Sequence, residues 1–189
     1  YEREPSMRAP AALRAVHPLG KSPVVADGPR ILAETGAIVE YIVDRHGGGR
    51  LAPPPGSDAR LAWTYWLHYA EGSAMPPLLL KLIFTLLPQR TPGLLRPLIR
   101  SVAGKAMAQL VEPQLAAHAD YWNEALAATG WFAGADFSAA DIMMSFPLEA
   151  AAQRGGALSR PRVADFLQRI HARPAYVRAL ERGGPYAYA

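Results

Sequence analysis

The stretch GKSPVVADGPRILAETGAI, residues 20–38, decides the fold of the first part of this chain. Short apolar runs flank the turn-forming residues 27–29, which predicts a strand at 24–26, a tight turn and a second strand at 30–33. From Thr35 onward the apolar residues recur at helical spacing, namely Ile38, Val39, Ile42 and Val43. The stretch therefore predicts a β-hairpin that runs directly into a helix.

Two interpretations of Pro23, at the start of the first strand, are open. A proline cannot donate to a ladder, so it has to occupy an edge or a first position. The ordinary interpretation is a trans bond, because only about one X–Pro bond in twenty is cis. The functional interpretation is a cis bond that turns the backbone N–H and C=O of Ser22 outward, where a peptide-like ligand pairs as an extra strand. We predict the cis bond.

Glu34 and Thr35 stand where the second strand passes into the helix. The structural interpretation makes Thr35 the N-cap, whose hydroxyl satisfies a free helix N–H. A helix N-terminus also attracts carboxylates, and the neighbouring Glu34 carboxylate attracts an ammonium group. Together the two residues suit the head of an amino acid that carries both charges, and one cap can serve both purposes.

The rest of the chain predicts a linker followed by helices. Residues 5–16 predict a short helix before the hairpin, and the glycines at 47–49 end the helix that follows it. The prolines of 50–58 indicate a semi-rigid linker. The helices expected beyond it are 58–87 with a kink or break at Pro76-Pro77, 93–128 with a bend at Pro113, 138–153, 160–171 and 174–182.

The apolar run from Pro76 to Pro88 is too short to span a membrane, because Lys81 interrupts it and prolines bound it. We expect it to form a buried helix, and we expect no membrane partner. The first residues lack the apolar segment of a signal peptide, which favours a cytoplasmic protein.

Composition narrows the function further. Half of the 189 residues are hydrophobic and 19% are charged, enough for a real core and too few charges for a disordered chain. Without cysteines there is no disulfide, zinc finger or cysteine nucleophile, so any thiol chemistry uses a thiol brought by a ligand. The net charge of +4 is scattered among acidic residues, which suits small anionic ligands and disfavours a nucleic-acid partner. We also expect no metal.

Residues 20–25, residues 34–38 and the pair Tyr41-Ile42 together resemble the cytosolic glutathione transferases. The resemblance implies an α+β, thioredoxin-like N-terminal domain in residues 1–49, a linker in 50–58 and an all-α helical bundle in 59–189. Two strands and two short helices cannot close a domain alone, so we expect a strand–helix–strand piece of about 30 residues to precede Tyr1.

In that family the first motif supplies the cis-proline loop and the second binds the γ-glutamyl end of glutathione. The resemblance therefore implies that Pro23 shapes the loop, Ser22 pairs through its main chain with the cysteinyl residue, and Lys21 faces the glutathione backbone or its glycyl end. Glu34 and Thr35 hold the γ-glutamyl head. The family often has valine before the cis-proline and serine after the acidic residue, and these two departures keep the backbone and hydroxyl roles.

A third motif lies in the helical part. Ser138 and Asp141 have the spacing of an N-cap and its N3 partner, and Phe137 and Ile142 have the spacing of a hydrophobic staple. They resemble the capping box of the same family's helical domain. That motif serves folding there, so we assign Asp141 no catalytic role.

The first long helix carries Trp63 and Trp66, which we expect in the core. The segment also resembles the family's helix that lines the second-substrate pocket and the dimer interface. The resemblance implies that Met75 and Pro76 face the electrophile and that, in a homodimer, Glu71 and Ser73 lie near the partner subunit's glutathione.

The resemblance implies an enzyme with glutathione as co-substrate, which conjugates its thiolate to hydrophobic electrophiles in detoxification. The family activates the thiol with a hydroxyl or cysteine just after the first strand and at the following helix. That region would precede Tyr1, which itself falls where the second strand should end, so we assign no catalytic residue. The alternative is a non-catalytic ligand-binding or protein-interaction module of the same fold, and a serine or tyrosine upstream would favour the enzyme.

Overall fold

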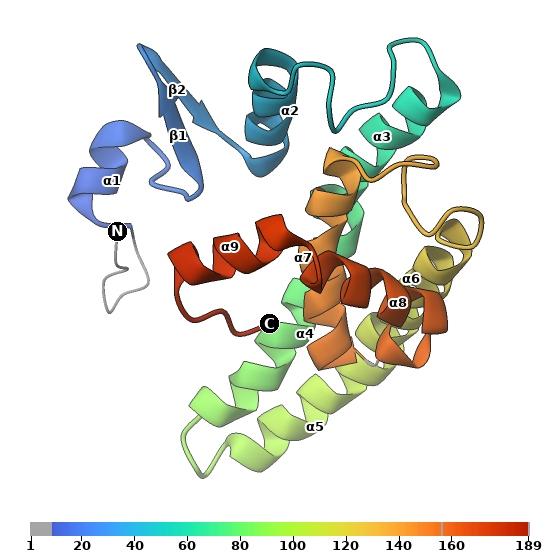
Figure 1. Cartoon of the computed structure of the whole chain (residues 1–189). Coiled ribbons are helices and arrows are strands. Elements are labelled where there is room, and N and C mark those ends of the chain that lie inside the picture. The colour runs from blue at the N-terminus through green and yellow to red at the C-terminus, as the bar shows by residue number, and fades with distance from the viewer. Residues whose placement is uncertain (1–8, 156, 189) are drawn as a thin grey trace. The chain divides into compact units, whose positions relative to one another are not determined.

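The computed structural model describes residues 9–155 and 157–188 (Figure 1). By its internal contacts the chain divides into two compact units, Tyr1–Ala52 and Pro53–Ala189.

The first unit contains the hairpin and the helix after it. Strands β1 (Val24–Asp27) and β2 (Arg30–Ala33) pair antiparallel, with Val24 opposite Ala33 and Asp27 opposite Arg30. Gly28, at a φ of 57°, opens the two-residue turn between them. Helix α2 (Thr35–His46) follows and ends at Gly47. The predicted strand–turn–strand–helix order is confirmed.

Helix α1 (Ala11–Val16) is shorter than the predicted 5–16. Pro10 has the extended φ and ψ of −63° and 155° and occupies the N-cap, so the residue before the helix is not itself helical. Residues 5–8 of the prediction lie outside the described part of the chain.

The second unit is all helical. Its first helix starts at an N-cap serine, because the Ser57 hydroxyl accepts a hydrogen bond from the Arg60 N–H at 3.1 Å. The elements are α3 (Asp58–Tyr69), the π-helical turn η1 (Ala70–Ala74), α4 (Met75–Arg90), α5 (Arg96–Ala106), the π-helical turn η2 (Met107–Val111), α6 (Glu112–Ala125), α7 (Ala139–Gly155), the 3₁₀ turn η3 (Ala157–Ser159), α8 (Pro161–His171) and α9 (Pro174–Gly183).

The prolines predicted to disturb the two long helices lie directly after the π turns. A kink or a break was predicted at Pro76-Pro77. The break is wrong, because the chain stays helical through both prolines. The Met75 N–H reaches back to the Ala70 carbonyl, which shifts the hydrogen bonding by one residue just before the prolines. The same device precedes Pro113, where the Glu112 N–H bonds the Met107 carbonyl.

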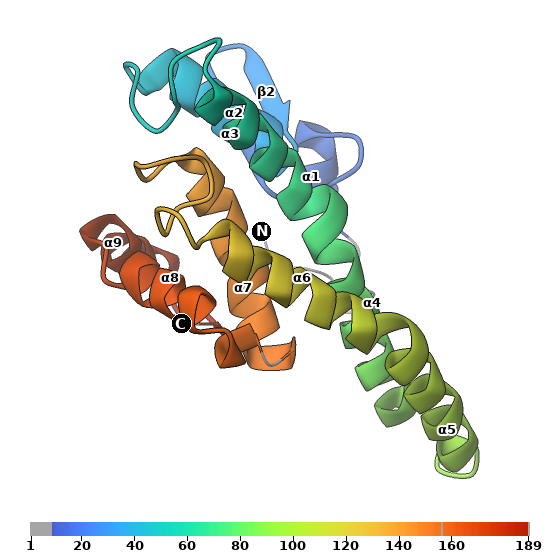
Figure 2. The same ribbon diagram turned by 90° about the vertical axis from the view of Figure 1, so that its right-hand side faces the viewer.

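Helix α7 lies at the centre of this unit and packs against α3, α4, α6 and α8 (Figures 1 and 2). Large side chains fill the space around it: Trp63 is 1% exposed, and Trp122 and Phe166 are fully buried. Trp66 is 5% exposed, so the prediction that both tryptophans lie in the core is confirmed.

The expectation that residues 76–88 form a buried helix is wrong. In α4 only Pro77, Leu78 and Pro88 are buried. The outward face is apolar and exposed, with Leu79 at 53%, Leu80 at 41%, Ile83 at 46% and Leu87 at 44%. Within the described residues one continuous helix, Asp58–Arg90, is long and apolar enough to cross a membrane by length and composition. In its most apolar stretch 22% of the residues are buried inside the structure.

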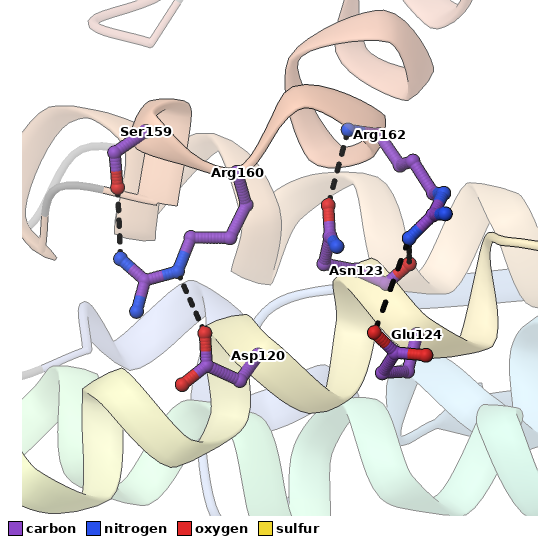
Figure 3. Close-up of polar contacts among 6 residues, drawn as sticks. All are labelled: Asp120, Asn123, Glu124, Ser159, Arg160 and Arg162. Carbon is purple, nitrogen blue, oxygen red and sulfur yellow. Dashed lines mark hydrogen bonds and ion pairs between the residues drawn. The ribbon is translucent and has the colours of Figure 1, made fainter.

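Polar contacts join α6 to the start of α8 (Figure 3). The Arg160 Nε lies 2.9 Å from the Asp120 carboxylate. The backbone N–H of Arg162, in the first turn of α8, donates to the Asn123 side-chain carbonyl at 3.1 Å. A side chain from another helix therefore satisfies an N–H that Arg160, at the N-cap, leaves free.

Candidate functional site

The hairpin brings the two sequence motifs to the same end of the sheet. Because Val24 pairs with Ala33, the residues that precede β1 and follow β2 leave the sheet together (Figure 1). Pro23 and Glu34 therefore flank the two paired strands at the same end of the hairpin, next to the N-terminus of α2. Lys21, Ser22 and Glu34 are exposed.

The Ser22–Pro23 peptide bond is cis, as predicted. In the described ranges, no backbone hydrogen bond uses the Ser22 N–H or C=O. Both groups are therefore free to pair with an extended ligand beside the start of β1.

The prediction that Thr35 is the N-cap is wrong. Glu34 occupies that position, with φ and ψ of 70° and 123°, and Thr35 is the first helical residue. A positive φ at a residue with a Cβ costs about 1–3 kcal/mol and is concentrated at ligand sites. No side chain caps α2, and its first backbone hydrogen bond runs from the Ile38 N–H to the Glu34 carbonyl at 3.0 Å.

The N-terminus of α2 is consequently open. The N–H groups of Thr35, Gly36 and Ala37 precede the first intrahelical donor, and no acidic residue stands in the first turn. Three free N–H groups and the positive end of the helix dipole favour an anion such as a carboxylate.

A hydrogen-bonded triad fixes α2 against the hairpin. The Tyr41 hydroxyl donates to the Asp27 carboxylate at 2.6 Å, and the His46 Nε2 lies 3.3 Å from the same oxygen. These contacts, the Tyr41 bond first, lower the pKa of Asp27 below its usual range. The sequence analysis gave this triad no role, because its members are 14 and 19 residues apart and no local motif joins them.

A cavity of about 290 Å³ lies at the other end of α2, lined by Ile42, Val43, His46, Gly47, Arg50 and Leu51. Its lining starts two helical turns beyond Thr35. It is therefore separate from the corner formed by Ser22, Pro23 and Glu34.

The residues expected around the second substrate lie in the second unit. Glu71 and Ser73 are exposed on the π turn η1, Met75 is half-buried at the start of α4, and Pro76 is exposed. Glu71 and Ser73 stand where the helix is locally widened, a feature often found at functional sites, and Met75 and Pro76 follow at the start of α4. Their roles remain predictions.

One of the two reciprocal bonds of the predicted capping box forms at the start of α7, from the Ser138 N–H to the Asp141 carboxylate. The other does not, because the Asp141 N–H bonds the Ser138 backbone carbonyl and not its hydroxyl. The Asp141 carboxylate accepts from the Ser138 N–H at 2.8 Å, from the Ser138 hydroxyl at 3.1 Å and from the Phe132 N–H at 2.8 Å. Burial raises the pKa of Asp141, and these donors oppose the rise. Every one of these bonds ties a loop to the helix. Across the described residues, no group of three or more His, Asp or Glu side chains could hold a metal ion.

A hairpin entered through a cis-proline, an uncapped helix N-terminus at the same end and an all-α second unit define the class: an α+β, thioredoxin-like region followed by a helical domain. Comparisons with known proteins agree. The model of the glutathione S-transferase N-terminal domain matches residues 2–50, and that of the C-terminal domain matches residues 78–174. The chain therefore belongs to the glutathione S-transferase family.

Individual relatives support the same fold. The chain is 29% identical to glutathione S-transferase 1 of Saccharomyces cerevisiae, over 96% of this chain and 82% of that protein. A glutathione S-transferase structure from Actinobacillus pleuropneumoniae has a TM-score of 0.75 at 27% identity, covering 98% of this chain and 80% of that one. A sphingomonad glutathione S-transferase, solved in complex with glutathione, has a TM-score of 0.72 at 24% identity and covers 97% and 86%.

Proposed function

We propose that the protein is a glutathione transferase that binds glutathione at the corner between the hairpin and α2. One observation carries the proposal. The free backbone groups of Ser22 and the uncapped N-terminus of α2 converge at one end of the hairpin, through the pairing of Val24 with Ala33.

The charges around this corner match those of the tripeptide. Glutathione carries a carboxylate and an ammonium group at its γ-glutamyl end and a second carboxylate at its glycyl end. We assign the γ-glutamyl carboxylate to the N–H groups and hydroxyl of Thr35 at the helix N-terminus, and the ammonium group to Glu34. Ser22 then pairs with the cysteinyl main chain, and Lys21 takes the glycyl carboxylate.

The chemistry proposed is nucleophilic attack by sulfur. A free thiol has a pKa of about 8.5 and is mostly protonated at neutral pH, so the site has to favour the thiolate. The thiol releases its proton, and the sulfur forms a C–S bond to an electrophilic carbon. Either a leaving group departs with its electron pair, or an activated double bond takes a proton from water. We assign the thiol-activating role to none of the described side chains.

The second substrate is proposed to be apolar. Met75 and Pro76 begin the outward face of α4, which continues through Leu79, Ile83 and Leu87 without a charged side chain. From Pro76 to Leu87 this face is about 16 Å long at the rise of an α-helix. Such a surface suits hydrophobic electrophiles, and conjugating them in the cytoplasm would make them more soluble, a detoxifying role.

We further propose a symmetric homodimer in which Glu71 and Ser73 lie near the partner subunit's glutathione. Both side chains are exposed on the π turn, where they make no hydrogen bond to any other described residue. The resemblance to the family's dimer helix supports this placement.

Titration calorimetry with glutathione tests the proposal. Glu34→Gln should weaken binding at least about tenfold, because a hydrogen bond to a charged group is worth about 1.5–3 kcal/mol. The matched control is Glu181→Gln, an exposed change on α9, which should leave affinity within about twofold. Absence of glutathione binding by the natural protein would contradict the proposal, and binding without conjugation of any aryl halide or enone would favour the non-catalytic module.

A further inference from the structure

The turn between α4 and α5 combines exposed leucines with arginines. We call residues 90–105, which include this turn and all of α5 but its last residue, the α4–α5 tip. Between Glu71 and Glu112 the sequence has no acidic residue. In both views the tip projects away from α7, α8 and α9 (Figures 1 and 2).

The apolar side chains at the tip are among the most exposed in the molecule. Leu94 is 93% exposed, Leu98 63%, Val102 57% and Leu95 53%. Leu95, Leu98 and Val102 recur at three- and four-residue spacing, so they share one side of α5, and Leu94 stands in the turn before it. Four such residues form a continuous apolar ridge rather than scattered surface leucines.

Four basic side chains lie in the same stretch of the chain and keep their charge available. By helical spacing Lys105 lies on the side of α5 that carries the ridge, whereas Arg96 and Arg100 lie on its other side. Arg90, Arg96, Arg100 and Lys105 are all exposed, and none of them forms an ion pair with another described residue. Lys81 is different, because its side chain is 15% exposed and lies 2.8 Å from the Glu112 carboxylate. Residues 90–105 therefore carry four positive charges that no ion pair among the described residues neutralises.

We propose that the α4–α5 tip binds an anionic lipid bilayer surface. Leu94, Leu95 and Leu98 enter the interface between headgroups and acyl chains, while Arg96 and Arg100 contact lipid phosphates. The proposal departs from the sequence-based expectation of no membrane partner. That expectation treated residues 76–88 as a buried helix, whereas the structure exposes their outer face and the apolar turn after it.

Charge complementarity selects this partner over the others. A second copy of the chain docked tip to tip would bring like charges together without a single acidic residue to pair them. A nucleic acid offers phosphates but no apolar layer for Leu94, the most exposed of the large apolar side chains that the structure describes. An anionic bilayer offers both, with the negative charge outside and the hydrocarbon beneath.

Co-sedimentation with vesicles tests the proposal directly. The natural protein should bind phosphatidylcholine vesicles that contain phosphatidylserine, bind pure phosphatidylcholine far more weakly, and dissociate as salt rises. Each arginine near an anionic surface contributes about fivefold, so Arg96→Gln with Arg100→Gln should lower the partition coefficient about 25-fold. Leu94→Ser with Leu95→Ser should lower it at least about tenfold, even if each leucine is only partly inserted.

The controls change the same residue types elsewhere on the surface. Arg178→Gln with Arg182→Gln on α9 removes the same charge, and Leu19→Ser removes a leucine that is 64% exposed. Both should bind vesicles as the natural protein does. All variants should keep their glutathione affinity, which separates this surface from the proposed transferase site.

Two results would overturn the proposal. One is no binding to phosphatidylserine vesicles at low salt, or an equal loss in the tip variants and their controls. The other is that Leu94→Ser with Leu95→Ser halves the mass measured by light scattering, because the tip would then be an interface between copies of the chain.

Discussion

Glu34 occupies the N-cap of α2, and Thr35, which alone was expected to form that cap, is the first helical residue. Glu34 takes the non-helical conformation at the helix start, and Thr35 is left with a hydroxyl that caps nothing. The helix therefore does not depend on that hydroxyl for its stability. A ligand is the partner that the free hydroxyl and the adjoining N–H groups can still gain.

Thr35→Ala should accordingly separate binding from folding. We expect glutathione affinity to fall about tenfold, since a hydrogen bond to a charged carboxylate is lost. The free energy of unfolding should change by less than about 0.5 kcal/mol, because no cap is removed. Calorimetry and urea denaturation measure the two effects. Thr85→Ala, an exposed threonine on α4, is the control, and a loss of 1 kcal/mol or more at Thr35, about the usual worth of a cap, would restore it as a cap.

Asp27 gives a pH dependence whose sign follows from its contacts. The Tyr41 hydroxyl and His46 hold the pKa of Asp27 below its ordinary 3.8, so the unfolded chain binds its proton at a higher pH than the folded one. Stability from this contact is present above about pH 4 and is lost as pH falls through the lowered pKa. Tyr41→Phe should move the pKa of Asp27 toward 3.8 in an NMR titration. Tyr65→Phe should leave it unchanged, and an unmoved pKa in Tyr41→Phe would remove Tyr41 as the cause.

Local sequence was sufficient to predict the backbone where single residues restrict its conformation. The hairpin and its turn were predicted, because glycine and proline restrict the backbone directly. The cis bond at Pro23 was predicted from the motif at the strand start, because a proline alone favours the trans bond. The N-cap was assigned one residue too late, since threonine is favoured there and the positive φ of Glu34 has no signature in its side chain. The Asp27–Tyr41–His46 triad forms only once the hairpin and α2 are packed together.

Helices α7, α8 and α9 meet around one buried carboxylate. Glu149, 3% exposed, accepts hydrogen bonds from the Tyr176 hydroxyl and the His171 Nε2, both at 2.9 Å, and from the Tyr186 hydroxyl. Burial and the bond to Glu149 raise the pKa of both tyrosines. The segment after α9 is held further by Gln153, whose side-chain amide donates to the Ala187 carbonyl at 2.7 Å. One side chain thus ties the last helix and the segment after it to α7.

Glu149→Ala should therefore loosen the end of the chain. We expect a loss of about 2 kcal/mol in the free energy of unfolding, because the donors lose their shared acceptor. Hydrogen exchange should accelerate in residues 174–188, while residues 24–46 stay unchanged. Glu181→Ala, an exposed change on α9, should cost less than about 0.5 kcal/mol. Equal exchange rates in residues 174–188 of the variant and the natural protein would show that α9 is held by other contacts.

The helices were predicted better than their surroundings. Periodicity and prolines located each long helix, yet the burial of α4 was wrong. A run of leucines reports that a helix is apolar, but not how many of its faces other helices cover. The sequence pattern also did not predict the hydrogen bonds to Glu149, because the donors lie 22 to 37 residues from Glu149 along the chain.

The exposed apolar groups of the second unit fall into separate regions. Apart from the α4–α5 tip, Leu61 is 73% exposed, Tyr65 46% and Tyr121 43%. The Tyr121 hydroxyl donates to that of Tyr65 at 3.1 Å, and the Tyr121 ring stacks on Trp66 at 5.3 Å between centroids. Leu61 and Tyr65 on α3 and Tyr121 on α6 thus form an exposed apolar and aromatic surface, the composition that protein interfaces favour at their centres.

We expect this surface, rather than the basic tip, to join two copies of the chain. Light scattering at micromolar concentration should give twice the chain mass of 20.4 kDa. Leu61→Ser with Tyr65→Ala should shift the protein to the monomer mass, since aromatic anchors at an interface centre are each worth about 2 kcal/mol or more. Leu94→Ser with Leu95→Ser is the matched control and should stay dimeric. If the natural protein has the monomer mass, both the dimer and the shared site are ruled out. If it is a dimer but Glu71→Ala keeps the full glutathione affinity, only the contribution of Glu71 is ruled out, because a residue that reaches the partner's ligand has to affect its binding.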